Sequence, residues 1–413
     1  METLNDILQK VKIASTKTAI LSTEQKNQAI INIANNIVKN SKSIIDANIV
    51  DVRKAEAKGI SKVMIDRLKL TKDKIKSISA DMIKISKLDD PVGEIIETYN
   101  HPNNMTINKV RVPFGVICAI YESRPNVSVD IACLCIKTGN ACVLKGGSEA
   151  INTNVAIVNI IQDSIKDIVD KNAVTLIKST DRTVVSELIQ AKEYIDLVVP
   201  RGGKNLINFV VSNSKVPFIE TGAGNCHLYV NEESDFEMAL KISINAKVSK
   251  PSVCNAIETI LVDKKIANEF LPKLKEELDK YQVIIKGCNE SIKILKNINL
   301  ATEEDYYQEY NDLIVTLIIV NDVNEAISHI NKYGTNHSET IVTNNIKTAE
   351  QFLNEINSAC VYVNASTRFS DGGEFGFGAE LGISTQKLHA RGPMGLKEMT
   401  TYKYKIYGEG QVR

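Results

Sequence analysis

The sequence has no excess of charge of either sign. Its 413 residues carry 50 lysines and arginines against 50 aspartates and glutamates, which gives a formal net charge of 0 at pH 7. Proteins that bind nucleic acids or anionic membrane surfaces usually carry a basic excess or a basic patch. The balance therefore gives no electrostatic reason to expect a nucleic-acid or a membrane partner.

Long apolar runs and paired cysteines are also absent. The longest nearly uninterrupted apolar run, residues 313–320, is far shorter than the roughly 20 residues that span a bilayer. Residues 1–18 contain no apolar core long enough for a signal peptide. None of the 8 cysteines forms a C-x-x-C pair, so no metal site or redox dithiol is predicted. Several cysteines lie inside apolar runs, which is typical of reduced thiols in a soluble cytoplasmic protein.

Hydrophobic patterning divides the chain into regions. Residues 3–89 repeat apolar side chains at helical spacing and predict a helical scaffold. Residues 94–99 and 105–112 alternate as the two strands of a hairpin. From residue 113 strands and helices alternate, which is typical of a parallel sheet that binds ligands at the carboxyl ends of its strands.

We therefore expect an α/β protein of several domains. Residues 1–93 and 111–233 would form a helical N-terminal region and a dinucleotide-binding domain, residues 234–365 a catalytic domain, and residues 366–395 a glycine-rich return to the active-site cleft. Residues 94–110 and 396–413 would form a small β arm. Because an isolated hairpin buries little surface, we expect this arm to pack on a second copy of the chain. The acidic residues 303–305 read as a solvated loop.

Cys254 is the candidate nucleophile. It lies between an amphipathic helical pattern and an apolar, β-rich run that begins at Ala256. The thiolate is the reactive form of cysteine, and a cysteine on a loop can be exposed and polarised. An arbitrary cysteine is more often a small buried side chain. The other motifs of this chain favour the catalytic interpretation.

Lys145 and the pair Gly202-Gly203 are the candidates for binding a dinucleotide. Each follows an expected strand and precedes an expected helix, where backbone N–H groups and a positive charge suit a phosphate. The full G-x-G-x-x-G pattern is missing, and such glycines often serve only a tight turn. No acidic residue follows Lys145 within two positions, which favours NADP(H) over NAD.

Several motifs together resemble the aldehyde dehydrogenase superfamily and, within it, the γ-glutamyl phosphate reductase family. The resemblance spans essentially the whole chain. One departure is Lys250, where the family usually has an arginine, so a bidentate contact is lost there. The motifs are VPFGV at 112–116, YESRPNV at 121–127, PRGGK at 200–204, IETG at 219–222, GNCH at 224–227, PSVCNA at 251–256 and EFGFGAELGISTQKLHARGPMG at 374–395.

The resemblance implies an aldehyde dehydrogenase-like fold and a specific reaction. That reaction is the NADPH-dependent reduction of L-glutamyl 5-phosphate to L-glutamate 5-semialdehyde, the second step of proline biosynthesis, through a thioester on Cys254. A separate glutamate 5-kinase is the expected functional partner, because no kinase half is attached to this chain. The resemblance also implies a homo-oligomer.

The resemblance and the chemistry of the residues assign expected roles. The Cys254 backbone N–H, with the Asn126 or Asn255 side chain, would stabilise the oxyanion. Glu220 matches a glutamate that activates water in hydrolytic relatives, and its role here stays open between catalysis and scaffolding. Further candidates are Glu374 for the cofactor and Ser123, Arg124, Lys204, His389 and Arg391 for the substrate, whereas His227, His329 and His337 read as ordinary hydrogen-bonded histidines.

Two other functions fit part of the sequence. A hydrolytic or CoA-acylating aldehyde dehydrogenase would need only Cys254, Glu220 and the glycine turns. A catalytically silent dinucleotide-binding protein could share the fold, because fold does not fix function. The motifs around Ser123 and His389 argue against the first, and the intact cysteine motif argues against the second.

Overall fold

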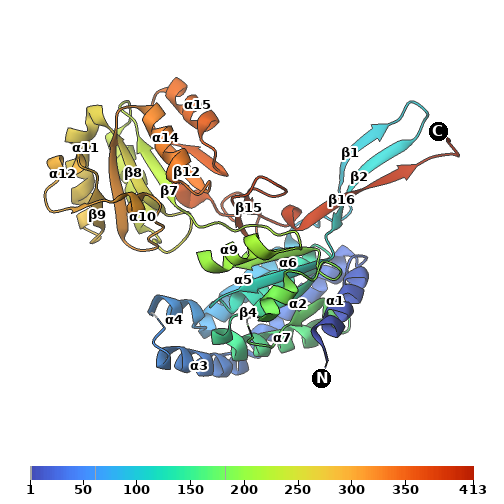
Figure 1. Cartoon of the computed structure of the whole chain (residues 1–413). Helices are drawn as coiled ribbons and strands as arrows, with labels where there is room; N and C mark the ends of the chain where they lie inside the picture. The colour runs from blue at the N-terminus through green and yellow to red at the C-terminus, as the bar shows by residue number, and fades with distance from the viewer. Residues whose placement is uncertain (1, 61, 182) are drawn as a thin grey trace. The chain divides into compact units, whose positions relative to one another are not determined.

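The computed structural model describes residues 2–60, 62–181 and 183–413, without the side chains of residues 62, 63 and 204. The chain divides into two compact units (Figure 1). The first comprises Met1–Thr221, Phe377–Leu381 and Met394–Arg413, and the second comprises Gly222–Gly376 and Gly382–Pro393. Within the described residues, the helices are too short or too polar for any of them to traverse a bilayer.

Five helices open the first unit, as the periodicity predicted. They are α1 (Leu4–Thr18), α2 (Thr23–Lys39), α3 (Ser41–Ala57), α4 (Lys62–Leu68) and α5 (Lys72–Lys87). Helix α2 begins with a capping box formed by Ser22 and Gln25, and it buries an apolar face that includes Ile30 and Ile33. Lys26 on the same helix forms a buried ion pair with Asp90 at 2.9 Å.

A four-stranded parallel sheet forms the centre of the first unit. The strands are β3 (Val116–Tyr121), β4 (Ala141–Gly146), β5 (Val174–Leu176) and β6 (Leu197–Arg201), in the order β5-β4-β3-β6. Every residue of β3 and β4 is buried, which explains the apolar sequence of β3 and of β4 up to Leu144. Helices α6 (Asn126–Lys137), α7 (Ile151–Ile165), α8 (Thr183–Leu188) and α9 (Lys204–Asn213) connect or follow these strands.

The order of this sheet reverses beside β3. From β3 the chain proceeds to β4 and β5 on one side and later to β6 on the other. In open α/β sheets, ligands bind at the carboxyl ends of the strands where the order reverses. This edge carries the segments 121–126, 145–149 and 201–204, which contain most of the candidate residues of the first unit.

The expected hairpin and tail strand are present. Strands β1 (Ile95–Asn100), β2 (Thr106–Pro113) and β16 (Thr400–Tyr407) form an antiparallel sheet in the order β1-β2-β16, drawn as an extended arm in Figure 1. Every residue of β1 is exposed. The arm also exposes apolar side chains on its other outer strand, among them Tyr404 and Ile406.

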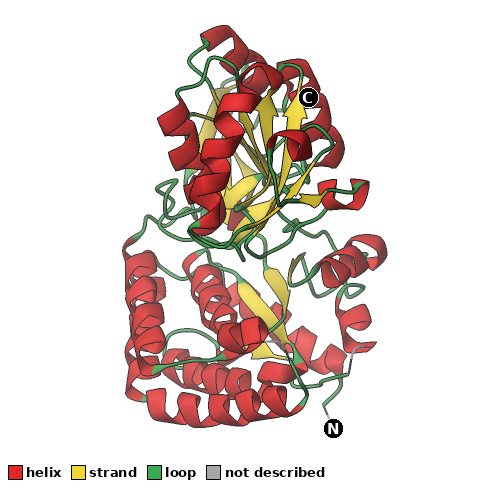
Figure 2. Ribbon diagram, turned by 90° about the vertical axis from the view of Figure 1, so that its left-hand side faces the viewer, coloured by secondary structure: helices red, strands yellow, loops and turns green. Residues whose placement is uncertain are grey.

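The second unit is a seven-stranded parallel sheet with helices on both faces (Figure 2). Its order is β10-β9-β11-β8-β7-β12-β13. The strands are β7 (Cys226–Val230), β8 (Ile257–Asp263), β9 (Ile284–Gly287), β10 (Asn299–Leu300), β11 (Ile314–Val320), β12 (Ser338–Val342) and β13 (Cys360–Val363). The helices are α10 (Phe236–Val248), α11 (Lys264–Asp279), α12 (Ser291–Ile294), α13 (Glu303–Tyr306), α14 (Val323–Tyr333) and α15 (Ile346–Glu355).

The second sheet has an apolar core on each face, because the side chains of its strands alternate between the two faces. Leu228 and Val230 of β7 pack in one cluster with α10 and α11, whereas Tyr229 packs in another with α14 and α15. Successive side chains of a strand point to opposite faces, so one buried strand contributes to both layers. Two short strands, β14 (Gly382–Ser384) and β15 (Gly392–Met394), pair with each other near the end of the chain.

Three local expectations were wrong. Strand β7 pairs with β8 and β12, so it belongs to the second sheet, although the first domain was predicted to extend to residue 233. Strand β12 was missed because Ser338, Glu339 and Thr340 gave it a polar sequence, yet all three are buried. Residues 303–305 begin α13 and do not form a loop. Glu303 and Glu304 are exposed, as expected, but Asp305 is buried and accepts a 2.6 Å hydrogen bond from Lys286.

Candidate active site

Cys254 lies in the loop between α10 and β8, as expected. Among the eight cysteines, all of which the structure describes, it is half-buried and the other seven are buried. Burial raises the pKa of Cys118 to about 12 and raises the pKa of Cys133 and Cys226 well above the ordinary thiol value. Those thiols are protonated at neutral pH, so accessibility distinguishes Cys254 as the reactive candidate.

A buried ion pair joins the two ends of the Cys254 loop. Lys247, in the last turn of α10, contacts Glu258 of β8 at 2.5 Å and also donates to the Ile257 carbonyl oxygen at 3.1 Å. The other Glu258 oxygen accepts from the Asn311 backbone N–H at 3.2 Å. This buried ion pair therefore fixes both ends of the loop that carries Cys254.

Asn255 is held inside a neighbouring turn. Its side-chain amide donates to the carbonyl oxygens of Ser370 at 2.9 Å and Arg368 at 3.4 Å, and its side-chain oxygen accepts from the Arg368 guanidinium. Its backbone oxygen accepts from the Thr367 hydroxyl at 2.7 Å. Because both N–H groups of the amide are used within the turn, the expected oxyanion role of Asn255 is not supported.

The turn after β3 is strained and tightly bonded. Ser123 has a φ of 46°, which is uncommon for a residue other than glycine. Its backbone N–H and its hydroxyl both donate to one oxygen of Glu149, at 2.6 and 2.9 Å. The Ser123 hydroxyl expected to bind substrate is therefore engaged with Glu149 in this structure.

A carboxylate occupies the glycine pair at the start of α9. Glu122 accepts a hydrogen bond from the Gly203 N–H at 2.9 Å. A side chain at Gly202 would approach the same Glu122 oxygen to 2.6 Å, so the absence of a Cβ permits this contact. The carboxylate stabilises the N-terminus of α9. A phosphate at the Gly203 amide would have to displace it.

Lys145 lies at the carboxyl end of β4 and is buried. Its ammonium group donates to the Gly146 carbonyl oxygen at 3.0 Å, and burial lowers its pKa while Glu149 opposes that shift. Nearby, the side-chain amide nitrogen of Asn154 is buried and has no hydrogen-bond partner among the described residues, and a side chain at Gly146 would collide with it. A cation and an unused donor fit a nucleotide phosphate or ribose.

Asn126 begins α6, and its side-chain amide donates to Asp130 at 3.0 Å. Desolvation raises the pKa of Asp130 to about 6, although the Asn126 hydrogen bond and the Arg201 charge partly oppose this. The contact orients the amide of Asn126 and uses one of its two N–H groups. One N–H remains for a further acceptor.

The remaining candidates divide between the two units. Arg124 and Glu220 are half-buried in the first unit. In the second unit Glu374, His389 and Arg391 are exposed, and Arg391 donates to the backbone and side-chain oxygens of Asn357 at 3.1 Å. The Lys204 side chain lies outside the described residues. The structure thus groups Ser123, Asn126, Lys145, Gly202 and Gly203 at one sheet edge and places Cys254, Glu374, His389 and Arg391 in the other unit.

Three carboxylates of the site were not anticipated from the sequence. Glu122 and Glu149 bond to candidate residues of the first unit, and Asp130 bonds to Asn126. Glu122 lies beside Ser123 within the motif at 121–127, so its role in the site could have been predicted from the sequence. Asp130 had the spacing of a helical neighbour of Asn126, four residues on. Glu149 reaches Ser123 only through the pairing of β3 with β4, which spacing alone does not reveal.

A cavity of about 790 Å³ lies elsewhere in the first unit. Its lining includes Leu4 of α1, Val158 of α7 and Leu176 of β5. None of the candidate site residues lines it. The candidate active site is therefore defined by its chemistry rather than by this cavity.

Comparison with known proteins decides the family. The model of the aldehyde dehydrogenase family matches residues 2–292 and 313–404. The chain belongs to the aldehyde dehydrogenase family. The membership and the α/β fold expected from the motifs are confirmed.

Within the aldehyde dehydrogenase family, the chain is similar to γ-glutamyl phosphate reductases. It is 52% identical over 414 residues to that of Dictyoglomus thermophilum, with 100% of both chains covered. It is 53% identical over 406 residues to that of Clostridium beijerinckii, covering 98% of each. A crystal structure of the Thermotoga maritima γ-glutamyl phosphate reductase superposes with a TM-score of 0.97 at 47% identity, covering 99% of each chain.

Other aldehyde dehydrogenase structures share the fold alone. An acetylating aldehyde dehydrogenase from Geobacillus thermoglucosidasius has a TM-score of 0.71 at 17% identity, covering 99% of this chain and 97% of that chain. The full-length similarity to reductases at about half identity does not favour the hydrolytic, CoA-acylating or silent alternatives.

Proposed function

We propose that this chain reduces L-glutamyl 5-phosphate to L-glutamate 5-semialdehyde, with release of phosphate, in proline biosynthesis. One observation carries the chemistry: Cys254 is half-buried on a loop, whereas the other seven cysteines are buried. The names of full-length relatives at about half identity support the substrate.

The reaction needs a nucleophile more than a strong acid, because an acyl phosphate is already activated. The Cys254 thiolate attacks the acyl carbon, the carbon–oxygen bond to phosphate breaks, and a thioester remains on the sulfur. Hydride addition to the thioester carbon then gives a tetrahedral oxyanion. Collapse of this oxyanion breaks the carbon–sulfur bond, releases the semialdehyde and regenerates the thiolate. The Cys254 backbone N–H and the remaining N–H of Asn126 are the proposed donors to the oxyanion.

NADP(H), when bound, supplies the hydride. Lys145 is the proposed cation for a cofactor phosphate, and Gly202, Gly203 and Glu374 are the other proposed contacts. Contact at Gly203 requires Glu122 to leave that amide, because its carboxylate would repel a phosphate. The preference for NADP over NAD rests on the absence of an acidic residue directly after Lys145.

Ser123, Arg124, His389 and Arg391 are the proposed substrate contacts. Arginine matches a carboxylate or phosphate in a bidentate manner, so Arg124 and Arg391 suit the two anionic ends of the substrate. Glu220 stays assigned either to proton transfer or to the scaffold. Hydrolysis would waste the thioester, so a role in activating water is disfavoured.

The remaining proposals concern location and assembly. The first unit would bind the dinucleotide and the second would carry the nucleophile. The exposed apolar side chains of the β arm support a homo-oligomer. A cytoplasmic location and functional coupling to a separate glutamate 5-kinase complete the proposal.

The decisive experiment is oxidation of glutamate 5-semialdehyde with NADP⁺ and then with NAD⁺, in the presence and absence of phosphate. We expect activity that requires phosphate, prefers NADP⁺ and collapses in Cys254→Ser. Activity without phosphate would indicate a hydrolytic enzyme instead. Absence of activity with both cofactors in the folded wild type would support the silent dinucleotide-binding function.

A further inference from the structure

The segment 224–227 lies directly against the backbone of Cys254. A Cβ placed on Gly224 would collide with the carbonyl group of Cys254. Two residues later, the Cys226 thiol donates to the same Cys254 carbonyl oxygen at 3.1 Å. This motif was recognised in the sequence, and the proposed reaction gives it no role. We propose that Cys226 is a positioning residue, whose thiol fixes the peptide that follows Cys254 and so holds the nucleophile in its reactive conformation.

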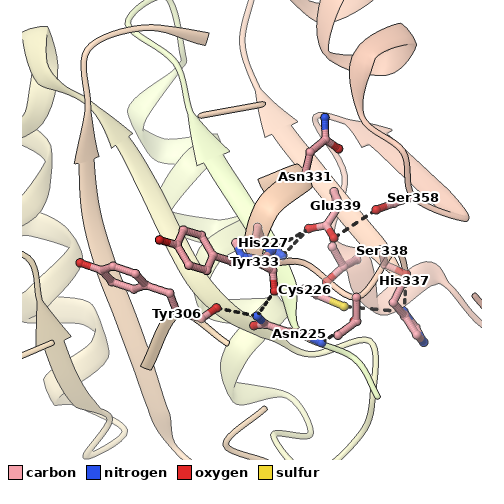
Figure 3. Close-up of polar contacts among 12 residues, drawn as sticks. Asn225, Cys226, His227, Tyr306, Asn331, Tyr333, His337, Ser338, Glu339 and Ser358 are labelled. Atoms are coloured by element: carbon pink, nitrogen blue, oxygen red, sulfur yellow. Dashed lines mark hydrogen bonds and ion pairs between the residues drawn. The ribbon is translucent and has the colours of Figure 1, made fainter. Parts of the chain in front are cut away.

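The segment 224–227, which contacts the Cys254 backbone, is itself held by hydrogen bonds. The Asn225 amide donates to the carbonyl oxygens of Tyr306 at 2.7 Å and Tyr333 at 2.9 Å, and its backbone N–H donates to Thr335 at 2.9 Å. Gly224 donates its backbone N–H to Glu309 at 2.8 Å. Four hydrogen bonds therefore fix the segment before Cys226. Figure 3 shows the Asn225 side chain with its contacts to Tyr306 and Tyr333.

The segment is fixed equally well after Cys226. The His227 backbone N–H and its ring nitrogen Nδ1 both contact one oxygen of Glu339, at 2.6 and 3.1 Å. The other Glu339 oxygen accepts from Ser358 at 3.2 Å. His227 and Glu339 lie on the paired strands β7 and β12, and Ser358 lies in the turn before β13. Figure 3 shows the dashed contacts among these three residues. Because the segment 224–227 is held in place, the Cys226 thiol can fix the position of the loop that carries Cys254.

Cys226 has the properties of a donor and not of a second nucleophile. It is fully buried, and burial raises its pKa well above the ordinary thiol value, so it keeps its proton. Another polar neighbour is Nδ1 of His337 at 3.6 Å, which also lies 2.8 Å from the Ser338 hydroxyl. The direct, shorter contact to the Cys254 oxygen is the one that reaches the active-site loop.

The Cys254–Asn255 peptide is thus held from two sides. Cys226 holds the Cys254 carbonyl, and the turn around Ser370 holds the Asn255 side chain. The Cys254 side chain is left as the half-buried group between these two anchors. Loss of the Cys226 contact would let the Cys254 peptide rotate, and a misplaced nucleophile reacts more slowly even when substrate still binds.

This inference rests on the proposed nucleophilic role of Cys254, and its test compares three variants in the full-length protein. Cys226→Ala removes the donor, and Cys226→Ser keeps a hydroxyl donor. Cys288→Ala removes a buried cysteine of the same unit whose sulfur accepts from Ser291 and Ile319 instead. We expect Cys226→Ala to lower kcat about tenfold with KM changed less than twofold, because one buried hydrogen bond is worth about that factor. Cys226→Ser should recover most of the rate, and Cys288→Ala should keep it.

A second readout separates this inference from the proposed reaction. The rate of Cys254 alkylation by iodoacetamide at a fixed pH, followed on its peptide by mass spectrometry, needs no substrate. In Cys226→Ala this rate should differ from that of the wild type, because the thiol is no longer held in one position, and in Cys226→Ser it should return towards the wild-type rate. Unchanged kcat and alkylation in a folded Cys226→Ala protein would overturn the inference. Equal impairment of the alanine and serine variants would also overturn it, whereas full activity of Cys254→Ser would overturn the proposed reaction instead.

Discussion

Accessibility, more than sequence position, distinguishes individual thiols in this chain. Seven cysteines are buried and Cys254 is half-buried on its loop. We expect iodoacetamide to modify the native protein at Cys254 first and the denatured protein at all eight positions, because the thiolate is the reactive form and burial suppresses it. Peptide mass spectrometry of samples quenched over time would measure this. Labelling of Cys226 or Cys118 at a rate similar to that of Cys254 would contradict the interpretation.

Asp130 predicts a pH-dependent stability difference. Its pKa in the folded protein is about 6, above the ordinary value of 3.8, so burial penalises the charged form. The stability that this group contributes is present in full below pH 3.8 and is lost as the pH rises through 6. Asp130→Asn should therefore gain stability relative to the wild type between pH 4 and pH 7, by about 1–2 kcal/mol.

Urea unfolding at several pH values would measure that gain. Asp163→Asn is the matched control, since Asp163 is exposed on the neighbouring helix α7. Its effect on the free energy of unfolding should be small, because substitutions of exposed side chains usually change stability little. A pH-independent effect of Asp130→Asn would mean that the carboxyl group is not desolvated as the structure indicates.

Some residue roles could be predicted from the sequence and others could not. The position of Cys254 on a loop followed from the switch between helical and strand patterns around it. The hydrogen bonds that occupy the Asn255 side chain could not be predicted, because its partners Arg368 and Ser370 are far along the chain. Motifs identify which residues matter, whereas contacts between distant segments decide which of their atoms remain available.

At the scale of elements, the Lys247–Glu258 pair joins α10 to β8. Burial raises the pKa of Glu258 and lowers that of Lys247, so each charge depends on the other for compensation. Lys247→Met or Glu258→Gln alone should destabilise the protein by about 3–5 kcal/mol, because one buried charged or polar partner is left uncompensated. The double variant Lys247→Met, Glu258→Leu should recover much of that loss.

Denaturant unfolding of the full chain would measure these differences. The exposed pair Lys273–Glu269 on α11 gives the control, since exposed pairs contribute little. Lys273→Met should leave the unfolding midpoint almost unchanged. If the single and double variants at positions 247 and 258 were equally unstable, the loss would come from packing and not from the unpaired charge.

Elements with regular apolar patterns were predicted well. Helical spacing predicts a helix at 323–332, and the apolar run at 313–320 predicts a strand. The elements α14 and β11 match these bounds within one residue at each end. Strand β12 was missed because its buried Glu339 depends on contacts with His227 and Ser358, which the local sequence does not show. Buried polar strands of this kind can be recognised only when their hydrogen-bond partners are known.

At the scale of the whole molecule, the β arm leaves two unpaired edges. Strands β1 and β16 are the outer strands of its sheet, and β16 exposes Tyr404 and Ile406. Exposed apolar edge strands favour association with another chain. We expect Tyr404→Glu with Ile406→Glu to lower the molar mass measured by light scattering to that of a smaller assembly or a monomer.

Lys403→Glu with Lys405→Glu is the matched control for the arm, since these residues alternate with the apolar ones on the same strand. The control should keep the mass of the wild type. An unchanged mass in the Tyr404→Glu, Ile406→Glu variant would mean that the arm is not the surface of association.

The overall family could be predicted from the sequence because its motifs are spread along the whole chain. The return of residues 396–413 as a strand of the β arm was also predicted, and β16 pairs with β2. The return of residues 377–381 to the first unit was not predicted. That segment is glycine-rich and has no regular apolar pattern that would indicate its partners.

The pairing of β16 with β2 has a consequence for synthesis on the ribosome. The arm hairpin emerges early, but its third strand is made only after every strand of the seven-stranded sheet. At roughly 5–20 residues per second, the edge of β2 waits many seconds for its partner. During that time the nascent chain presents an open strand edge. The hairpin therefore stays a two-stranded sheet until nearly the whole chain has been made.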